Sequence, residues 1–262
     1  LEFDAASSDY IDTNNAIISG FSSFTASAWV NFSTSLNLPP IFYQEGSASE
    51  IIILLRYHHS LQKFQLYSET TNGLSIAQQP NNSFTPVVGQ WYNILALYDG
   101  SNLKIYLDTV EIATITQTGT LVTGTDTFKI GKYSNNYFNG SISNCSIWNT
   151  ALTSAQVTEL YNEGVPSNLN NHSAYSNLVS WWQLGSNSSY NTNWTVLDEK
   201  GTNNGTSSNM GEDAIVDGVG SYANGLSSGM GGDEVIGDAP YSSANSLSVN
   251  MDIEDRVSNT PS

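Results

Sequence analysis

Short apolar stretches alternate with polar clusters along the first half of the chain. The stretches are rich in Ile, Leu, Val, Tyr, Phe, Trp and Thr, and clusters of Gly, Asn, Ser and Asp separate them at intervals of roughly 8 to 12 residues, as in all-β domains. In residues 103–108 (LKIYLD), Leu103, Ile105 and Leu107 fall on one face, as a half-buried strand requires. The Asp99-Gly100 pair before them predicts a hairpin loop. The expected strands lie within residues 1–15, 24–32, 51–59, 63–69, 90–100, 102–116 and 126–133.

One segment has a helical pattern instead. Thr153 and Gln156 have the spacing of a capping box, and Leu152 and Val157 have the spacing of a hydrophobic staple. The apolar stripe and the stop signals that follow are Val157, Leu160 and Tyr161, then Gly164 and Pro166. The sequence therefore predicts one short helix, which ends at Gly164, after a β-rich region.

The order of these segments resembles a known family. LEFDAASSDYID, FTASAWV, QWYNILALYDGSNLKIYLDTVEI and FKIGKYSNNYFNGSISNCSIWNTALTSAQVTELYNEG together are similar to laminin-G-like domains of the concanavalin A-like lectin/glucanase superfamily. The resemblance covers residues 1–165. It implies an all-β jelly-roll sandwich of two antiparallel sheets with one short helix, in which the curved face or the loops at its rim bind carbohydrate or protein.

Residues 166–209 form a second part of the chain. Within them, an aromatic segment and a Gly-x-Asn-x-Gly-Thr turn at 201–206 resemble the stretch that in many such domains precedes the LEFD-type strand. Here the stretch follows the domain. Two explanations stay open: a permuted arrangement, in which 178–184 supplies a strand that the start of the chain lacks, or an incomplete second copy.

Residues 210–262 contain an internal repeat, so we expect an extended C-terminal repeat tail. Residues 223–240 align without gaps on 244–261, and 207–219 form a degenerate third copy. A period of about 21 residues is too short and too polar to build its own core. The units are therefore expected to dock on another surface, and the alternative is a disordered Gly/Ser/Asn-rich tail. The expected assembly residues are Met210, Leu226, Met230, Pro240, Leu247, Met251 and Pro261.

Charge narrows the range of partners. The formal net charge is −17, from 24 acidic and 7 basic residues, so no basic patch is available to bind a nucleic-acid backbone. No apolar run is long enough to span a bilayer, and no cleavable signal is recognisable at the start. The chain begins within an expected strand, which is compatible with removal of an upstream segment. A surface dominated by Asn, Ser and Thr is typical of secreted or virion-surface β-proteins, which predicts a virion-surface or extracellular location.

Three residues with possible chemistry have ordinary explanations. Cys145 lies in the expected strand SISNCSIW and is interpreted as a small buried apolar residue, because no Cys/His pairing is visible. His58 and His59 are adjacent, so in a strand they would point to opposite faces and would not chelate one metal together.

Aromatic and amide side chains near expected loops and strand ends are the candidate carbohydrate-binding residues. A sugar site needs planar polar groups for hydroxyls and an aromatic face for the apolar side of the ring. The candidates are Tyr43, Gln44, Tyr57, Tyr67, Asn72, Tyr133, Asn135, Asn136 and Tyr137.

Calcium is the one cofactor that the sequence suggests, because Ca²⁺ prefers carboxylate and carbonyl oxygens and related domains often hold it at a rim. The candidate ligands are Asp9, Asp12, Asn14 and Asp99. The alternative is that these residues only form turns.

Hydrolysis is disfavoured. Retaining glucanases of the superfamily carry a Glu-x-Asp-x-x-Glu strand, which places acid and nucleophile on one face, and this chain has no such strand. We therefore expect a protein that is not an enzyme, a surface structural protein of a virion or an extracellular assembly. It would bind glycans, host-surface polymers or partner proteins and form homo-oligomers, capsid-associated particles or fibres through its repeats. The repeats loosely resemble C-terminal parts of laminin-G-like proteins from marine phages and microbes. The alternatives are an adhesin without an assembly role and, more remotely, a glycoside hydrolase.

Overall fold

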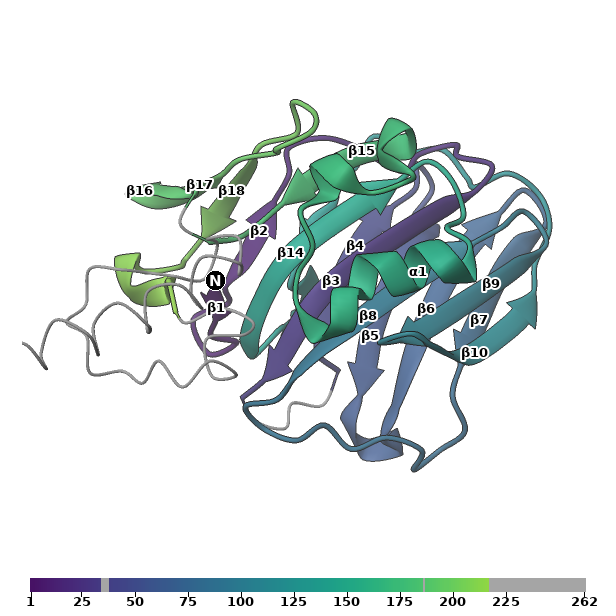
Figure 1. The fold of residues 1–262 in the computed structure, drawn as a ribbon, viewed down its shortest axis with the longest axis horizontal. Coiled ribbons are helices and arrows are strands. Elements are labelled where there is room, and N and C mark those ends of the chain that lie inside the picture. Colours follow the sequence, from purple (N-terminus) through teal and green to yellow (C-terminus); the bar gives the residue numbers. More distant parts are fainter. Residues whose placement is uncertain (34–37, 186, 217–262) are drawn as a thin grey trace, which may run out of the picture.

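The apolar stretches form strands that pair antiparallel in two large sheets packed face to face (Figure 1). The computed structural model describes residues 1–33, 38–185 and 187–216. Within these residues one sheet has seven strands: β1 (Glu2–Phe3), β14 (Gly140–Trp148), β3 (Phe24–Phe32), β8 (Trp91–Tyr98), β9 (Asn102–Leu107) and β10 (Val110–Thr116) in spatial order, with β15 (Leu178–Trp182) also paired to β14.

The other sheet has nine strands within the described residues. In spatial order they are β16 (Ser189–Asn191), β17 (Asn193–Val196), β18 (Gly205–Ser208), β2 (Tyr10–Asp12), β11 (Lys129–Ile130), β4 (Pro40–Glu45), β5 (Ile51–His58), β6 (Lys63–Thr70) and β7 (Gly73–Gln78). A separate hairpin pairs β12 (Lys132–Tyr133) with β13 (Asn136–Tyr137). Together with α1 (Ser154–Tyr161), this arrangement confirms the predicted all-β sandwich with one short α-helix in the described part of the chain.

The main core lies between the two sheets. The strand register places Ile11, Ile130, Phe42, Leu55 and Leu66 in one row across the nine-stranded sheet. All five are buried in the same apolar cluster. Because side chains alternate between the faces of a strand, the residues next to this row in each strand point to the outer face of the sheet.

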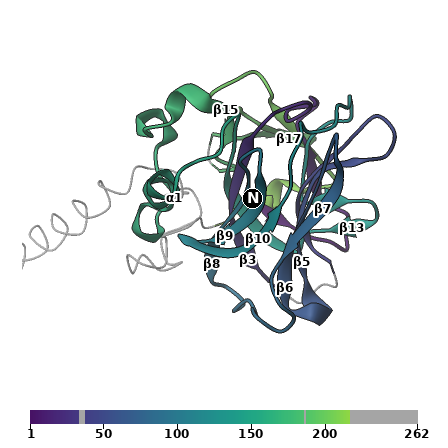
Figure 2. The ribbon, with the colours of Figure 1, turned by 90° about the vertical axis from the view of Figure 1, so that its right-hand side faces the viewer.

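A second core covers the outer face of the seven-stranded sheet. Leu95, Tyr106 and Trp148 from the strands pack with Val157 and Leu160 of α1. Figure 2 shows α1 on this side of the sandwich, with β5, β6 and β7 on the other. The alternation in 103–108 suggested that Tyr106 faces water, but it is buried because the helix covers it.

The start of α1 follows the sequence prediction. Thr153 is the N-cap and accepts a hydrogen bond from the Gln156 amide, while the Gln156 side chain accepts one from the Thr153 amide. The predicted stop at Gly164 is wrong, because the helix ends at Tyr161. Asn162 takes the left-handed conformation (φ 46°) and its N–H bonds to the Thr158 carbonyl. A short 3₁₀ turn, η2 (Asn162–Gly164), follows.

Removing the N-cap side chain should weaken this helix. Thr153→Ala is expected to lower the free energy of unfolding by about 1 kcal/mol, because a backbone N–H of the first turn loses its acceptor. Urea unfolding measures the change. The matched control is Thr158→Ala in the same helix, where alanine has the higher helix propensity and no loss is expected. An equal loss in both variants would contradict the capping role.

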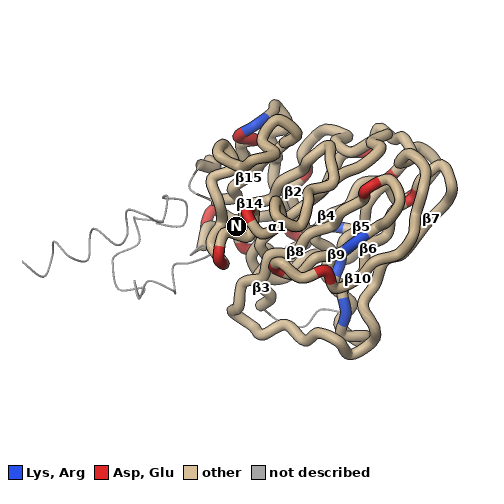
Figure 3. Tube along the Cα trace, turned by 45° about the vertical axis from the view of Figure 1, so that its right-hand side comes forward, with Lys and Arg blue, Asp and Glu red and all other residues tan. Residues whose placement is uncertain are grey.

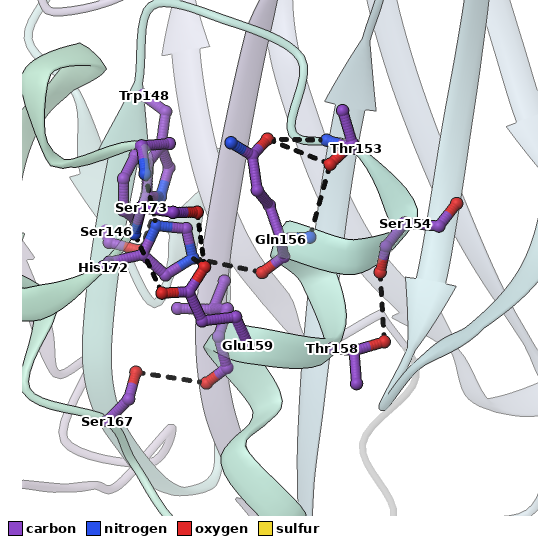
Figure 4. Close-up of polar contacts among 12 residues, drawn as sticks. Ser146, Trp148, Thr153, Ser154, Gln156, Thr158, Glu159, Ser167, His172 and Ser173 are labelled. Atoms are coloured by element: carbon purple, nitrogen blue, oxygen red, sulfur yellow. Dashed lines mark hydrogen bonds and ion pairs between the residues drawn. The ribbon is translucent and has the colours of Figure 1, made fainter.

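Polar contacts fasten the segment after α1 onto the helix (Figure 4). Buried His172 lies against the Trp148 ring, with ring centroids 4.6 Å apart, and its Nε2 is 3.1 Å from the Gln156 carbonyl oxygen. The Glu159 carboxylate accepts hydrogen bonds from the amide and the hydroxyl of Ser173. The short turns η3 (Leu169–Asn171) and η4 (Tyr175–Asn177) flank this contact.

The Glu159 contact predicts a pH effect on stability. Burial alone would raise the pKa of Glu159, but the hydrogen bonds from Ser173 and the nearby His172 hold it below its ordinary value. A carboxylate with a depressed folded-state pKa stabilises the protein above its unfolded pKa of about 4.3, and the effect is lost as pH falls through the folded value. Thermal midpoints of wild type and Glu159→Gln should therefore converge between about pH 5 and pH 3. A difference that persists undiminished at the acid end would contradict this role. The control is Glu163→Gln, which removes a nearby exposed charge and leaves the Ser173 contact intact.

The segment that follows supplies strands to both sheets. Its strand β15 pairs with β14, and β18 pairs with β2 at one end of the nine-stranded sheet. Trp182 is fully buried against Phe128, with ring centroids 6.2 Å apart and planes 11° apart, and its Nε1–H donates to the Asn203 carbonyl. Asp198 organises the following turn by accepting backbone hydrogen bonds, including one from Trp181.

Of the remaining sequence predictions, some are confirmed, some differ from the structure and some lie outside the described residues. Cys145 is buried in β14 as predicted, and burial raises the pKa of its thiol. The two histidines do not both lie in a strand: His58 ends β5 and His59 begins η1 (His59–Leu61). Met210 was predicted to be an assembly residue, but it is buried in the main core of its own chain, just before η5 (Glu212–Ala214). The other predicted assembly residues lie outside the described residues. No helix in the described ranges is long and apolar enough to cross a membrane.

Candidate carbohydrate-binding face

A row of side chains runs across the outer face of the nine-stranded sheet. The register aligns Tyr67 with Leu54, Leu54 with Tyr43, Tyr43 with Lys129 and Lys129 with Asp12. This row is adjacent to the buried row described above, so the pleat turns it away from the core. Leu54 is nevertheless almost fully buried, at 1% exposed.

Two tyrosines form the centre of this face. The rings of Tyr43 on β4 and Tyr133 on β12 are 4.8 Å apart at an angle of 57°. The Tyr43 hydroxyl donates to Glu45 Oε2 at 2.7 Å, and burial together with this contact raises the pKa of Tyr43. Figure 2 shows β13, the partner of β12, on the outer side of the nine-stranded sheet. The hairpin thus brings the half-buried Tyr133 ring against Tyr43 on the strand face.

Planar polar groups surround the aromatic ring at the other end of the row. The guanidinium of Arg56 lies 4.8 Å from the centre of the Tyr67 ring and donates to the Tyr67 hydroxyl at 2.6 Å. Arg56 Nε also donates to Gln65 Oε1, and Gln65 Nε2 donates to Gln78 Oε1 at 2.8 Å. This network holds amide and guanidinium groups beside an aromatic face, the combination that hydroxyl-rich ligands require.

A second aromatic group flanks the face beside β2. Lys132 Nζ lies 3.9 Å from the centre of the Tyr10 ring and 5.6 Å from that of Tyr137. The two rings are 6.4 Å apart. Basic residues are sparse along the described chain (Figure 3), yet Arg56, Lys129 and Lys132 all lie on this sheet or its hairpin.

We call the outer surface of β4, β5 and β6 with the β12–β13 hairpin the tyrosine face. It is defined by Tyr43, Tyr67, Tyr133, Arg56 and Gln65. Tyr43 (9% exposed) and Gln65 (5% exposed) are buried, so the partly exposed Tyr67, Tyr133 and Arg56 supply its accessible surface. Three of these five were expected from the sequence. Arg56 and Gln65 were missed, as were Gln78, Lys132 and Tyr10. The strand register pairs Arg56 with Gln65, Gln65 with Gln78 and Lys132 with Tyr137, so these groupings become visible only once the strands are paired.

Two predicted binding residues are wrong because they belong to the interior. Gln44 is 0% exposed and its Oε1 accepts the backbone N–H groups of Ile17 and Ile18 at 3.1 Å each. Tyr57 is buried in the main core and donates its hydroxyl to the Phe84 carbonyl. Neither side chain is available to a ligand.

The predicted asparagines lie at hairpin turns. Asn72 is exposed between β6 and β7 and donates to Thr118 Oγ1 at 2.9 Å. Asn135 is exposed in the turn of the β12–β13 hairpin, and Asn136 pairs with Tyr133 in the same hairpin. The hairpin residues therefore accompany the tyrosine face, whereas Asn72 is held by the loop that contains Thr118.

Two of the predicted calcium ligands, Asp12 and Asn14, form a local turn. Asp12 Oδ1 accepts from the Asn14 amide and Asp12 Oδ2 from the Thr127 hydroxyl, both at 2.8 Å. Lys129 Nζ lies 3.9 Å from the same carboxylate. In this structure, hydrogen bonds and a lysine engage this carboxylate, as in an ordinary turn.

The other two predicted calcium ligands lie elsewhere. Asp99 closes the β8–β9 hairpin, where it accepts backbone hydrogen bonds from Ser101 and Asn102 and faces Lys104 at 3.6 Å. Asp9 is buried and accepts from the Asp4 amide. In the part of the chain that the structure describes, no three His, Cys, Asp or Glu side chains form a group that could hold a metal.

Several solved structures are similar to this chain, and one with a TM-score above 0.5 shares its fold. A Bacteroides ovatus protein, provisionally named a carbohydrate-binding protein, is 20% identical with a TM-score of 0.58. The match spans 79% of this chain and 56% of that one. A pentraxin from Limulus polyphemus is 16% identical with a TM-score of 0.46, over 58% of this chain and 74% of its own. Domain 4 of the arabinanase AbnA from Geobacillus stearothermophilus, solved with arabinotriose, is 20% identical with a TM-score of 0.42, over 57% and 69%.

Among curated proteins, none matches the chain. Residues 5–158, more than half of the chain, match the Laminin_G_3 family model, described as the concanavalin A-like lectin/glucanases superfamily. The match confirms the family that the order of strands and the capped helix suggested. By this match and by its fold, the chain belongs to the Laminin_G_3 family of the concanavalin A-like lectin/glucanases superfamily.

Proposed function

We propose that the tyrosine face binds carbohydrate. The observation that carries the proposal is the Tyr43–Tyr133 pair, which lies on the outer side of the sheet in line with Tyr67 and its Arg56–Gln65 network. Aromatic faces pack against the apolar C–H side of a sugar ring, and planar amide and guanidinium groups satisfy its hydroxyls. An extended face of this kind suits an oligosaccharide chain better than a single small molecule.

The name of one similar structure is compatible with carbohydrate binding. The Bacteroides ovatus protein carries a provisional carbohydrate-binding name, and its similarity to this chain supports the fold. Since fold alone does not define a binding site, the proposal depends on the tyrosine face itself.

We also propose that the protein acts by binding and not by hydrolysis. Glycoside hydrolysis needs two carboxyl groups that face each other across the glycosidic bond. On the tyrosine face the Glu45 carboxylate accepts the Tyr43 hydroxyl, and the Asp12 carboxylate is engaged by Thr127 and Lys129. These contacts favour a structural role for both acids.

An assembly role for the C-terminal repeats is the second proposal, and the repeated sequence of residues 223–240 and 244–261 supports it. In this proposal the repeats join copies of the chain, or join it to a virion or another extracellular particle. Light scattering after size-exclusion chromatography, with the full chain and a chain that ends at residue 216, tests the role. Multimers of the full chain alone would support joining of copies through the repeats, and monomers in both cases would contradict it.

A glycan microarray probed with the full chain tests carbohydrate binding. We expect a restricted set of oligosaccharides to bind, with binding that free oligosaccharide competes away. Addition of a chelator should leave this binding unchanged, because the described residues contain no group of three His, Cys, Asp or Glu side chains that could hold a metal. If no glycan binds above background, with the chain shown to be folded by circular dichroism, the proposal is wrong.

A further inference from the structure

A small cavity with a few polar groups in an otherwise apolar lining lies on the opposite side of the molecule, between the seven-stranded sheet and the end of α1. Its volume is about 10 Å³. Trp29, Asn93 and Trp181 line its inner wall, and Leu160 of α1 covers it. Asn144 and Ser167, which are partly exposed, line it on the solvent side. The cavity is separate from the tyrosine face, because it lies on the outer surface of the other sheet.

Two buried polar atoms in the lining have no hydrogen-bond partner among the described residues. They are Oδ1 of Asn93, whose side chain is 1% exposed, and Nε1 of Trp181, which is 4% exposed. The two N–H donor groups of Asn93 have hydrogen-bond partners. Its side-chain Nδ2 donates to Ser27 Oγ at 3.2 Å, and its backbone N–H donates to Asp108 Oδ1. Buried polar atoms are nearly always paired, so one unpaired acceptor and one unpaired donor in the same cavity wall call for a common partner.

A bulge in β14 contributes to the same cavity. The register between β14 and β3 shifts between Ser143 and Ser146, and Asn144 takes the left-handed conformation with φ 48°. Bulges of this kind redirect side chains and are frequent beside binding sites. Here the bulge places Asn144 in the same cavity lining as Asn93 and Trp181.

The two unpaired atoms define the chemistry of the partner. The indole N–H of Trp181 needs an acceptor, and the amide oxygen of Asn93 needs a donor. A carboxylate can only accept and an ammonium group can only donate, whereas a hydroxyl or a water does both. The volume suits a single oxygen atom. We propose that this cavity is a binding site for one hydroxyl-type oxygen, which accepts from Trp181 Nε1–H and donates to Asn93 Oδ1.

Water and a sugar hydroxyl are the two possible sources of this oxygen, and a crystal structure distinguishes them. Crystals of the full chain would be grown and cryoprotected without polyols, and a second set would be soaked in a disaccharide. We expect an oxygen within hydrogen-bond distance of both Trp181 Nε1 and Asn93 Oδ1. A water in both sets assigns the site to water, and a disaccharide hydroxyl at that position in soaked crystals assigns it to sugar.

The result that would overturn the proposal is the absence of an ordered oxygen at this position in both sets, or a direct protein partner for either atom. Trp181→Phe supplies a second test, because it keeps an aromatic ring and removes the donor. We expect loss of the oxygen density in that variant. The internal control is Trp182, whose Nε1 already donates to the Asn203 carbonyl and should gain no such oxygen. This inference does not depend on carbohydrate binding at the tyrosine face.

Discussion

Trp182→Ala is expected to lower the free energy of unfolding by about 3–5 kcal/mol, the usual range for a large aromatic side chain removed from a core. Trp182 is 0% exposed, stacks on Phe128 and donates its indole N–H to the Asn203 carbonyl. It lies in β15, beyond the residues that match the family model. A large loss would therefore show that this later segment is part of the main core. Chemical denaturation monitored by circular dichroism measures the change.

Leu197→Ala is the control for this experiment. Leu197 is an apolar residue of the same segment that is 41% exposed, so its truncation should change stability by less than about 0.5 kcal/mol. If Trp182→Ala were as mild as Leu197→Ala, the segment of residues 178–208 would not be a structural part of the sandwich.

Tyr133→Ala is expected to weaken carbohydrate binding about tenfold or more, equivalent to about 1.4 kcal/mol. The substitution removes the ring that faces Tyr43 in the middle of the tyrosine face. Tyr133 is half-buried on a short hairpin, so the loss in folding stability should be small compared with the loss in binding. Calorimetric titration with an oligosaccharide found by the microarray measures the affinity.

Tyr175→Ala is the matched control. Tyr175 is another half-buried tyrosine and has a lysine, Lys200, 3.5 Å from its ring centre, but it packs on the second core at the other sheet. Its loss should leave affinity unchanged. Equal weakening in both variants would indicate a general effect on folding, and unchanged binding in Tyr133→Ala would remove this tyrosine from the site.

The strands and the helix start were predictable because their signals are local. Alternation and turn residues predicted the hairpin at Asp99, and the spacing of Thr153 and Gln156 predicted the helix cap. The helix end was less predictable, because Asn162 takes the left-handed conformation two residues before the glycine that was expected to do so. Asparagine adopts this conformation more readily than most residues, which makes it a competing stop signal.

The binding face was harder to predict because it depends on which way each side chain points. Residues 40–45 were not among the expected strands, so nothing assigned Tyr43 and Gln44 to opposite faces. In a strand, a shift of one residue exchanges the buried and exposed sets. Tyr43 lies on the outer face and Gln44 in the core because consecutive side chains of a strand point to opposite faces. Arg56 and Gln65 could be assigned to the tyrosine face only after the pairing of β5 with β6 was known.

The second core was also beyond the sequence pattern. Tyr106 alternates with apolar residues as an exposed position would, yet α1 and the segment after it cover that face. Tertiary packing decides which element covers a given face of a sheet, and the sequence of a single strand does not contain that information. The same reasoning applies to β15 and β18, whose partners β14 and β2 are distant in sequence.

The most direct test of carbohydrate binding at the tyrosine face is to follow the tyrosine ring signals by nuclear magnetic resonance as an oligosaccharide is added to the selectively labelled full chain. We predict that the signals of Tyr43, Tyr67 and Tyr133 shift with saturation, while those of Tyr106 and Tyr175 on the other side of the sandwich stay in place. Saturable shifts confined to Tyr106 and Tyr175 would contradict the proposal and locate the carbohydrate on the opposite sheet.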